Sequence, residues 1–272
     1  MSRTKVIPIP VLGRHAVNAH LLLGRHPVIV DAGTPGSAGR ILDAVARHGV
    51  DPADLRLIVI THGHLDHFGS AAELHRLTGA PVAGHVADLR QYRTGRVREP
   101  YLPTGRMGSL MARNRQLHVA VDPFEPEVLL DGELAMHEFG VDARIMPTPG
   151  HTAGSVSVLT DDGDLVAGDL IANSFMGLVP GRPANPPFHD DPRRNLASLR
   201  AMLALGPARL HVGHGVPLDP ERVRDWAVRE QRRLDRAAAA GRLRVRPPEP
   251  EPEPEPEPKR GRGSADGPAR TA

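Results

Sequence analysis

One short segment of the sequence constrains the fold more than any other. An apolar, β-branched run, Leu57-Ile-Val-Ile60, is typical of a strand that is buried on both faces of a sheet. Thr61-His-Gly-His-Leu-Asp-His67 follows it directly. In an extended backbone alternate side chains share a face, so we expect His62, His64 and Asp66 to converge and the last histidine to serve a neighbouring point. Strand ends project side chains from a rigid sheet into a crevice, so the segment predicts a functional site.

Three further residues of the same chemical types come just after predicted strands. His151 lies in Pro147-Thr-Pro-Gly-His-Thr-Ala-Gly-Ser155, and Asp169 follows Leu165-Val-Ala-Gly168. His214 lies between two glycines after the predicted strand Arg209–Val212. The recurrence of such side chains beyond strand ends indicates that all of them belong to one site.

Any metal at this site must be held by nitrogen and oxygen, because the chain has no cysteine. Disulfides, thiolate metal sites and cysteine nucleophiles are excluded for the same reason. Neutral imidazole and carboxylate suit zinc, iron or manganese. Two such cations about 3.5–4 Å apart repel each other unless an anionic ligand lies between them, and a carboxylate such as Asp169 meets that need. A water molecule shared by the cations loses a proton near neutral pH, so no serine nucleophile is required.

Short strands and helices alternate over most of the chain, as the apolar periodicity and the turn residues indicate. The predicted strands, besides the one described above, are Lys5–Val11, Ala16–Leu23, Pro27–Val30, Pro81–Gly84, Val128–Leu130, Arg144–Met146, Ser155–Leu159, Leu165–Ala167 and Arg209–Val212. The predicted helices are Ala38–His48, Ser70–Thr78, Asn195–Leu205 and Pro220–Ala240.

We expect one catalytic domain over residues 1–245, in which residues 88–125 form an arginine-rich insertion. The insertion is either a lid that recognises an anionic substrate or a solvated surface segment, and the residue types leave both open. Residues 246–272 are rich in Glu-Pro repeats, which cannot bury a core, so we expect a disordered tail there.

The pattern of histidines and aspartates resembles that of the metallo-β-lactamase superfamily. The family pattern is His-x-His-x-Asp-His, then a lone His, a lone Asp and a final His, with an Asp ahead of them all. The resemblance covers residues from about 5 to 240. It implies an α/β fold, a four-layer αββα sandwich of two mixed β-sheets with outer helices. It also implies roles for individual residues: His62, His64 and His151 on a first metal, Asp66, His67 and His214 on a second, Asp169 as the bridge, and Asp31 as the residue that orients the histidine loop.

Within the superfamily, the ligand positions are similar to those of the glyoxalase II-like thioester hydrolases. Asp169 weighs against a true β-lactamase, which lacks this bridging carboxylate. Quorum-quenching lactonases place a tyrosine shortly after the bridging aspartate, whereas this chain has Leu170-Ile-Ala-Asn-Ser174. The expected function is therefore metal-dependent hydrolysis, in which hydroxide bound to two divalent ions cleaves an ester, thioester or related carbonyl substrate. Zinc is expected first, with iron or manganese as alternatives.

Other functions stay open at this point. If only one metal binds, Asp66 could act as a general base. Some relatives are mononuclear iron oxygenases that act on persulfides, and they would use the counterparts of His62, His151 and Asp169. Lactonase activity and a non-catalytic metal-binding role are further alternatives.

Charge and hydropathy limit the kinds of partner that we expect the protein to bind. Lys and Arg number 34 against 32 Asp and Glu, a formal charge of +2, which gives no general case for nucleic acid binding. The sequence has neither an apolar stretch of membrane-spanning length nor an apolar region typical of a signal peptide near its first residue. We therefore expect a cytoplasmic protein that acts on a small molecule, for which an anionic substrate is one option. The oligomeric state does not follow from the sequence.

Most of the remaining histidines fall into two groups. His85 and His211 lie nearer the predicted site in the sequence and are candidates for a supporting or substrate contact. Seven others are expected to be ordinary surface or packing residues: His15, His26, His48, His75, His118, His137 and His189.

Overall fold

Side chains of the central strands point alternately into two different apolar clusters. In strand β4 (Leu57–Val59), Ile58 packs with helices on one face, whereas Leu57 and Val59 pack on the other face. Strand β3 (Pro27–Val30) alternates in the same way. Because both faces of these strands are apolar, the sheet must be covered on both sides.

Two mixed sheets supply the inner layers of this computed structural model, which describes residues 4–174 and 178–247. The other strands are β1 Lys5–Leu12, β2 Val17–Leu23, β5 Val82–His85, β6 Val128–Leu130, β7 Leu134–Ala135, β8 Ala143–Pro147, β9 Val156–Thr160, β10 Asp164–Val166, β11 Ala172–Ser174, β12 Val179–Ala184 and β13 Arg209–His211. A six-stranded sheet has the order β1-β2-β3-β4-β5-β6, and a five-stranded sheet has the order β13-β10-β9-β8-β7. Strands β11 and β12 form a separate antiparallel pair.

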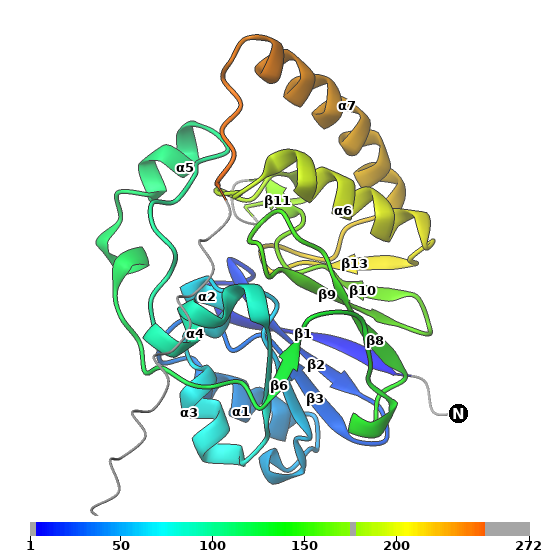
Figure 1. Cartoon of the computed structure of the whole chain (residues 1–272). Coiled ribbons are helices and arrows are strands. Elements are labelled where there is room, and N and C mark those ends of the chain that lie inside the picture. Colours follow the sequence, from blue (N-terminus) through cyan, green and yellow to red (C-terminus); the bar gives the residue numbers. More distant parts are fainter. Residues whose placement is uncertain (1–3, 175–177, 248–272) are drawn as a thin grey trace, which may run out of the picture.

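Helices cover the outer face of each sheet (Figure 1). Their bounds are α1 Ala38–Arg47, α2 Leu65–Phe68, α3 Ala71–Thr78, α4 Leu89–Thr94, α5 Arg106–Met111, α6 Pro192–Ala204 and α7 Pro220–Ala239. Helices α1 and α3 pack on the six-stranded sheet, and α6 and α7 pack against β10 and β13 of the five-stranded sheet. A third apolar cluster lies between the two sheets. The predicted four-layer αββα sandwich is therefore confirmed.

Local sequence signals explain where the long helices begin. The carboxylate of Asp191 accepts the amides of residues 193 and 194, and that of Asp219 accepts the amides of residues 221 and 222. Each capping aspartate is followed by a proline at the first helical position, where its missing N–H costs nothing. The cap explains why α6 begins at Pro192 and not at Asn195, the start expected from apolar spacing alone.

Several elements were not predicted. Helices α2, α4 and α5 and strands β7, β11 and β12 are short, and their sequences carry little periodicity. The expected tail lies outside the described residues, apart from its first two positions. Among the residues that the structure describes, no helix combines the length and the apolar character needed to cross a bilayer.

The first part of the arginine-rich 88–125 segment packs against the six-stranded sheet. The side chain of Tyr92 is fully buried, and its ring centroid lies 5.2 Å from that of Phe124 and 5.7 Å from that of Phe68. The alternative of a wholly solvated insertion is therefore wrong for this part of the segment.

The chain after α7 (orange in Figure 1) runs back beside α5 of the insertion. Arg246 fastens it there. The Arg246 guanidinium donates to the carboxylate of Asp190 at 2.6 Å. It also donates to the backbone carbonyls of Glu99 at 3.2 Å and Pro100 at 2.5 Å. Because a planar guanidinium presents donors in fixed directions, these bonds join three separate segments at one point.

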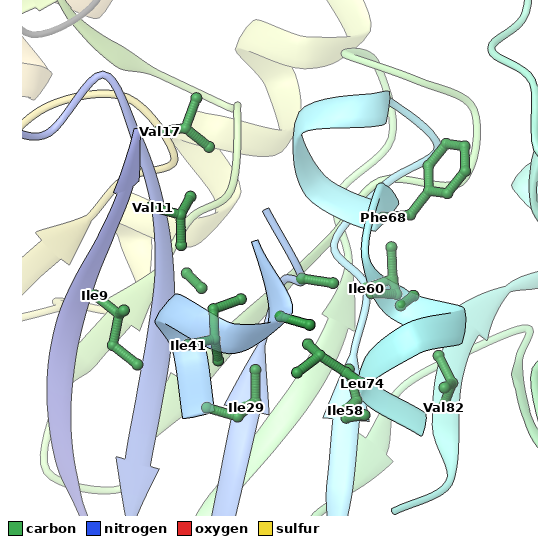
Figure 2. Close-up of a cluster of buried hydrophobic side chains, with 14 of the residues drawn as sticks. Ile9, Val11, Val17, Ile29, Ile41, Ile58, Ile60, Phe68, Leu74 and Val82 are labelled. Carbon is green, nitrogen blue, oxygen red and sulfur yellow. The ribbon is translucent and has the colours of Figure 1, made fainter. Parts of the chain in front are cut away.

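Two leucines of α3 provide a matched test of the outer layer. Leu74 is fully buried in the cluster that Figure 2 shows, whereas Leu77 on the same helix is 56% exposed. We expect Leu74→Ala to lower the free energy of unfolding by about 2–5 kcal/mol, because it leaves a cavity. Leu77→Ala should change it by less than about 0.5 kcal/mol. Urea denaturation followed by circular dichroism measures both, and equal effects would contradict this account of the layer.

Candidate metal centre

The backbone after β4 bends over residues 62–64, and the short helix α2 follows at Leu65. His62 and His64 nevertheless lie together, with 3.2 Å between Nε2 of the first and Nδ1 of the second. The predicted convergence of Asp66 with these two histidines on an extended backbone is wrong, because the helical turn rotates Asp66 away from them. Its carboxylate instead lies 3.4 Å from Nε2 of His214.

The structure brings together all seven side chains that the sequence singled out as ligands. They form three overlapping groups in which the possible ligand atoms lie within 4.8 Å of one another: His62, His64 and His151; His62, His67 and Asp169; and Asp66, His67 and His214. We refer to the first of these as the first group and to the last as the second group.

Distances within the first group are short. Nε2 of His151 lies 3.1 Å from Nε2 of His62 and 2.9 Å from Nδ1 of His64. All three rings are buried. Facing imidazole nitrogens at such separations repel one another unless a proton or a cation lies between them, because each neutral acceptor carries a lone pair.

The carboxylate of Asp169 lies between the two groups. One oxygen, Oδ2, is 3.0 Å from Nε2 of His214 and 3.6 Å from Nε2 of His151. The other, Oδ1, is 3.6 Å from Nε2 of His67. Both Asp169 Oδ1 and His67 Nε2 are buried and lack a hydrogen-bond partner in the described part of the chain. Such orphaned atoms fit a site built for divalent cations, which neutral imidazole and carboxylate would bind.

Comparison with known proteins agrees with this geometry. A sequence profile described as the Metallo-beta-lactamase superfamily matches residues 12–214. The chain belongs to this superfamily. A probable metallo-hydrolase of Bacillus subtilis, YflN, is 29% identical over 210 residues, which are 70% of this chain and 76% of that protein. A hydroxyacylglutathione hydrolase of Anaeromyxobacter dehalogenans is 30% identical over 226 residues, 74% of this chain and 73% of that protein.

The fold of this superfamily member is also similar to solved structures. The metallo-beta-lactamase family protein TTHA1429 from Thermus thermophilus is 25% identical, with a TM-score of 0.60. The similarity covers 87% of this chain and 82% of that one.

Buried hydrogen bonds fix which ring nitrogen faces the centre of the site. Nδ1 of His67 donates to Asp31 at 2.8 Å, and Nδ1 of His214 donates to the carbonyl of Ala16 at 2.5 Å. Since the carbonyl can only accept, Nδ1 of His214 carries the proton and leaves Nε2 available. Asp31 also accepts the amide and the hydroxyl of Thr61, at 2.8 Å and 3.0 Å.

Two supporting residues were not found from the sequence. His189 was expected to be an ordinary packing residue, but it is buried with its Nδ1 3.2 Å from Nδ1 of His151. Thr61, directly before the histidine run, places its hydroxyl 3.0 Å from Nδ1 of His62. Each residue contacts the ring of a candidate ligand and not the centre of the site. Neither belongs to the His-x-His-x-Asp-His pattern, so the sequence carries no signal for it.

The two histidines considered as supporting candidates have other contacts. His85 accepts the amide of Ala87 at the start of its own helical turn. His211 pairs with Asp164, with 3.1 Å between Nε2 and Oδ1. Within the described residues, neither makes a hydrogen bond to the seven candidate ligands.

The first group is electrostatically prepared to bind a cation without losing protons. Burial lowers the pKa of His62 and His151 well below the usual histidine value, and neighbouring histidines lower it further. Burial also lowers the pKa of His64, although nearby carboxylates oppose the change. These three rings are therefore neutral at neutral pH.

The second group behaves in the opposite way. Burial alone would disfavour the charged form of His67, but nearby carboxylates, Asp31 above all, outweigh it and raise the pKa to about 10. Burial is likewise outweighed at His214, whose pKa Asp169 raises to about 9. Burial would raise the pKa of Asp169, but the surrounding histidines, His214 first, hold it well below its usual range.

A small cavity of about 20 Å³ adjoins the candidate ligands. Five of the seven candidate ligands line it: His64, Asp66, His151, Asp169 and His214. The rest of its wall is apolar or aromatic and comes from the insertion and from the segment before His189: Tyr101, Met111, Leu117, Pro187 and Phe188. The rings of Tyr101 and Phe188 stack with centroids 4.3 Å apart. A cavity of this size holds about one water molecule, so a substrate must displace part of this wall.

The arginines of the insertion do not line this cavity. Arg93 pairs with Glu125 at 2.6 Å, and Arg90, Arg96 and Arg98 line a different hollow, of about 650 Å³. Three residues of the insertion do line the cavity, namely Tyr101, Met111 and Leu117, and all three are apolar or aromatic. The expectation that its arginines recognise an anionic substrate at the site is not supported by this arrangement.

The opposite pKa shifts predict different proton release on metal binding. Near neutral pH the second group must lose about two protons, from His67 and His214, whereas the first group loses almost none. Affinity of the second group should therefore rise with pH up to about 10, the higher of the pKa values of His67 and His214, while that of the first group is nearly flat above about 6.5.

Calorimetry with zinc in buffers of different ionisation enthalpy measures the released protons. His151→Ala leaves the second group intact, and His214→Ala leaves the first. Equal proton release from the two variants would contradict the assigned protonation states.

Proposed function

We propose that this metallo-hydrolase holds two divalent cations between its sheets and uses them to cleave an ester or thioester of a neutral, apolar acyl group. The main observation behind this proposal is that two groups of possible ligands lie beside one carboxylate, that of Asp169. The similarity to a hydroxyacylglutathione hydrolase and to a probable metallo-hydrolase supports hydrolysis of a carbonyl substrate.

We assign one cation to each group. His62, His64 and His151 would hold the first, Asp66, His67 and His214 would hold the second, and Asp169 would bridge them. Such cations, when bound, polarise a carbonyl and lower the pKa of a water molecule. Nitrogen and oxygen ligands of this kind suit zinc best, and iron or manganese also bind such sets.

The protein's own residues have separate tasks in this scheme. Asp169 supplies the negative charge that lets two cations approach each other. Asp31 holds His67 in the orientation and tautomer that leave Nε2 for the metal. Asp66 is the most accessible of the carboxylates, with 23% of its side chain exposed, and it lines the cavity. If only the first group is loaded, Asp66 is placed to accept a proton from water.

The wall of the cavity determines the acyl group in this proposal. Tyr101 and Phe188 present ring faces beside His64, whose ring centroid lies 5.3 Å from that of Tyr101. Met111 and Leu117 complete an apolar surface. An acyl chain that replaces water on this surface gains the free energy of apolar burial, whereas a charged acyl group finds no lysine or arginine among the residues lining the cavity.

Asp169→Asn tests the shared carboxylate with almost no change in shape. We expect the purified variant to lose one of two bound metal ions and its kcat/KM to fall at least about 100-fold, because the amide cannot neutralise two cations. Asp161→Asn, on a side chain that is 63% exposed, is the matched control and should leave metal content and rate unchanged.

Metal analysis and hydrolysis of a panel of thioesters, esters and lactones provide the readout. Two metals and an unchanged rate in Asp169→Asn would refute the proposal. A single iron per wild-type chain with oxygen consumption would show a dioxygenase instead.

Phe188→Ala tests the apolar wall. We expect kcat/KM for an octanoyl thioester to fall about 10–100-fold and that for an acetyl thioester to fall less than about threefold, because only the longer chain reaches the lost surface. Metal content should stay as in the wild type. An equal fall for both substrates would show that Phe188 does not select the acyl group.

A further inference from the structure

The two loops that supply the first group come from different sheets and need a common support. Gly63 lies between His62 and His64 after β4 of the six-stranded sheet. Residues 152–154 follow His151 and precede β9 of the five-stranded sheet. Since a metal site tolerates only small errors in ligand position, something must fix the separation of these loops.

One buried carboxylate bonds to both loops. Asp88, just after β5, is 0% exposed. Its Oδ2 accepts the amide of Gly63 at 2.7 Å and the hydroxyl of Thr152 at 2.6 Å. Its Oδ1 accepts the amide of Gly154 at 3.0 Å. All three donors are buried, so removal of the carboxylate would leave the two amides without partners, whereas the Thr152 hydroxyl keeps Oγ of Ser155 at 2.9 Å.

Close packing shows that the loops are shaped around this side chain. A Cβ built on Gly154 would lie 2.7 Å from Cγ of Asp88, and one built on Gly63 would lie 3.3 Å from its Cβ. Only glycine lets both backbones approach the carboxylate this closely.

The contacts of Asp88 differ from those of Asp31, the other buried carboxylate beside the site. Asp31 bonds to His67 of the second group and to Thr61. Asp88 bonds to one residue between His62 and His64 and to two residues that follow His151. None of these hydrogen bonds involves a residue of the second group.

We propose that Asp88 is a positioning residue for the first group: it sets the distance between the His62–His64 loop and the His151 loop and so determines the affinity of the first cation. The proposal rests on the ligand assignment of the proposed function. Asp88 itself touches neither cation nor substrate, and its effect passes through the backbone of the two loops.

The test separates the two groups. Asp88→Asn is made in a His214→Ala background, which keeps the first group, and in a His151→Ala background, which keeps the second. Zinc affinity is measured by competition with a chromophoric chelator. We expect Asp88→Asn to weaken zinc binding about 10–100-fold in the first background and less than about threefold in the second. Asp31→Asn is the comparison and should weaken zinc binding more in the second background than in the first, because Asp31 bonds directly to His67 and reaches His62 only through Thr61.

Each other outcome is decisive. Equal losses in both backgrounds, or no loss in either, would overturn the role of Asp88, because a general structural effect is not selective for one group. If neither background binds one equivalent of zinc before Asp88 is changed, the ligand assignment itself fails. Should Asp88→Asn not fold, Thr152→Val, which removes one of the three donors, is judged in the same two backgrounds, with a smaller but equally selective loss expected.

Discussion

The rest of the site depends on a negative charge placed among buried imidazoles. Asp169 lies within 3.6 Å of nitrogens from both groups, in a region almost without solvent. Five histidines packed so closely would repel one another if they were protonated. Two cations bound among them would likewise repel each other. A carboxylate between them lowers both costs, because opposite charges attract strongly where water is scarce. The buried cluster is therefore understandable only with its central anion.

The sandwich places this cluster by joining the two sheets through backbone hydrogen bonds. The amide of Val156 donates to the carbonyl of Thr61 at 2.8 Å, and the amide of Asn18 donates to the carbonyl of Gly213 at 2.8 Å. The side-chain amide of Asn18 adds bonds to two further carbonyls of the His214 loop. Ligands that are remote in the sequence are thus held by rigid strands and not by each other.

Most of the layers and the identity of the ligand-type residues could be predicted from the sequence, because apolar alternation and clustered histidines are local signals. The helical turn at Leu65 could not, since four residues carry too little periodicity, and strand alternation misplaced Asp66 for that reason. The family resemblance grouped Asp66 with His67 and His214, as the structure does. Asp88 and His189 were missed because their partners are distant in the sequence. The arginines of the insertion looked like substrate contacts, but their direction depends on packing that only the folded chain shows.

The fastening at Arg246 has a consequence for how this protein is handled. It bonds to Pro100, directly before Tyr101, and to Asp190, two residues after Phe188. The last described segment is therefore hydrogen-bonded to two of the segments that line the cavity beside the candidate ligands. A truncation that removes Arg246 would therefore release both of these segments at once, so a shortened form of the chain must keep this residue.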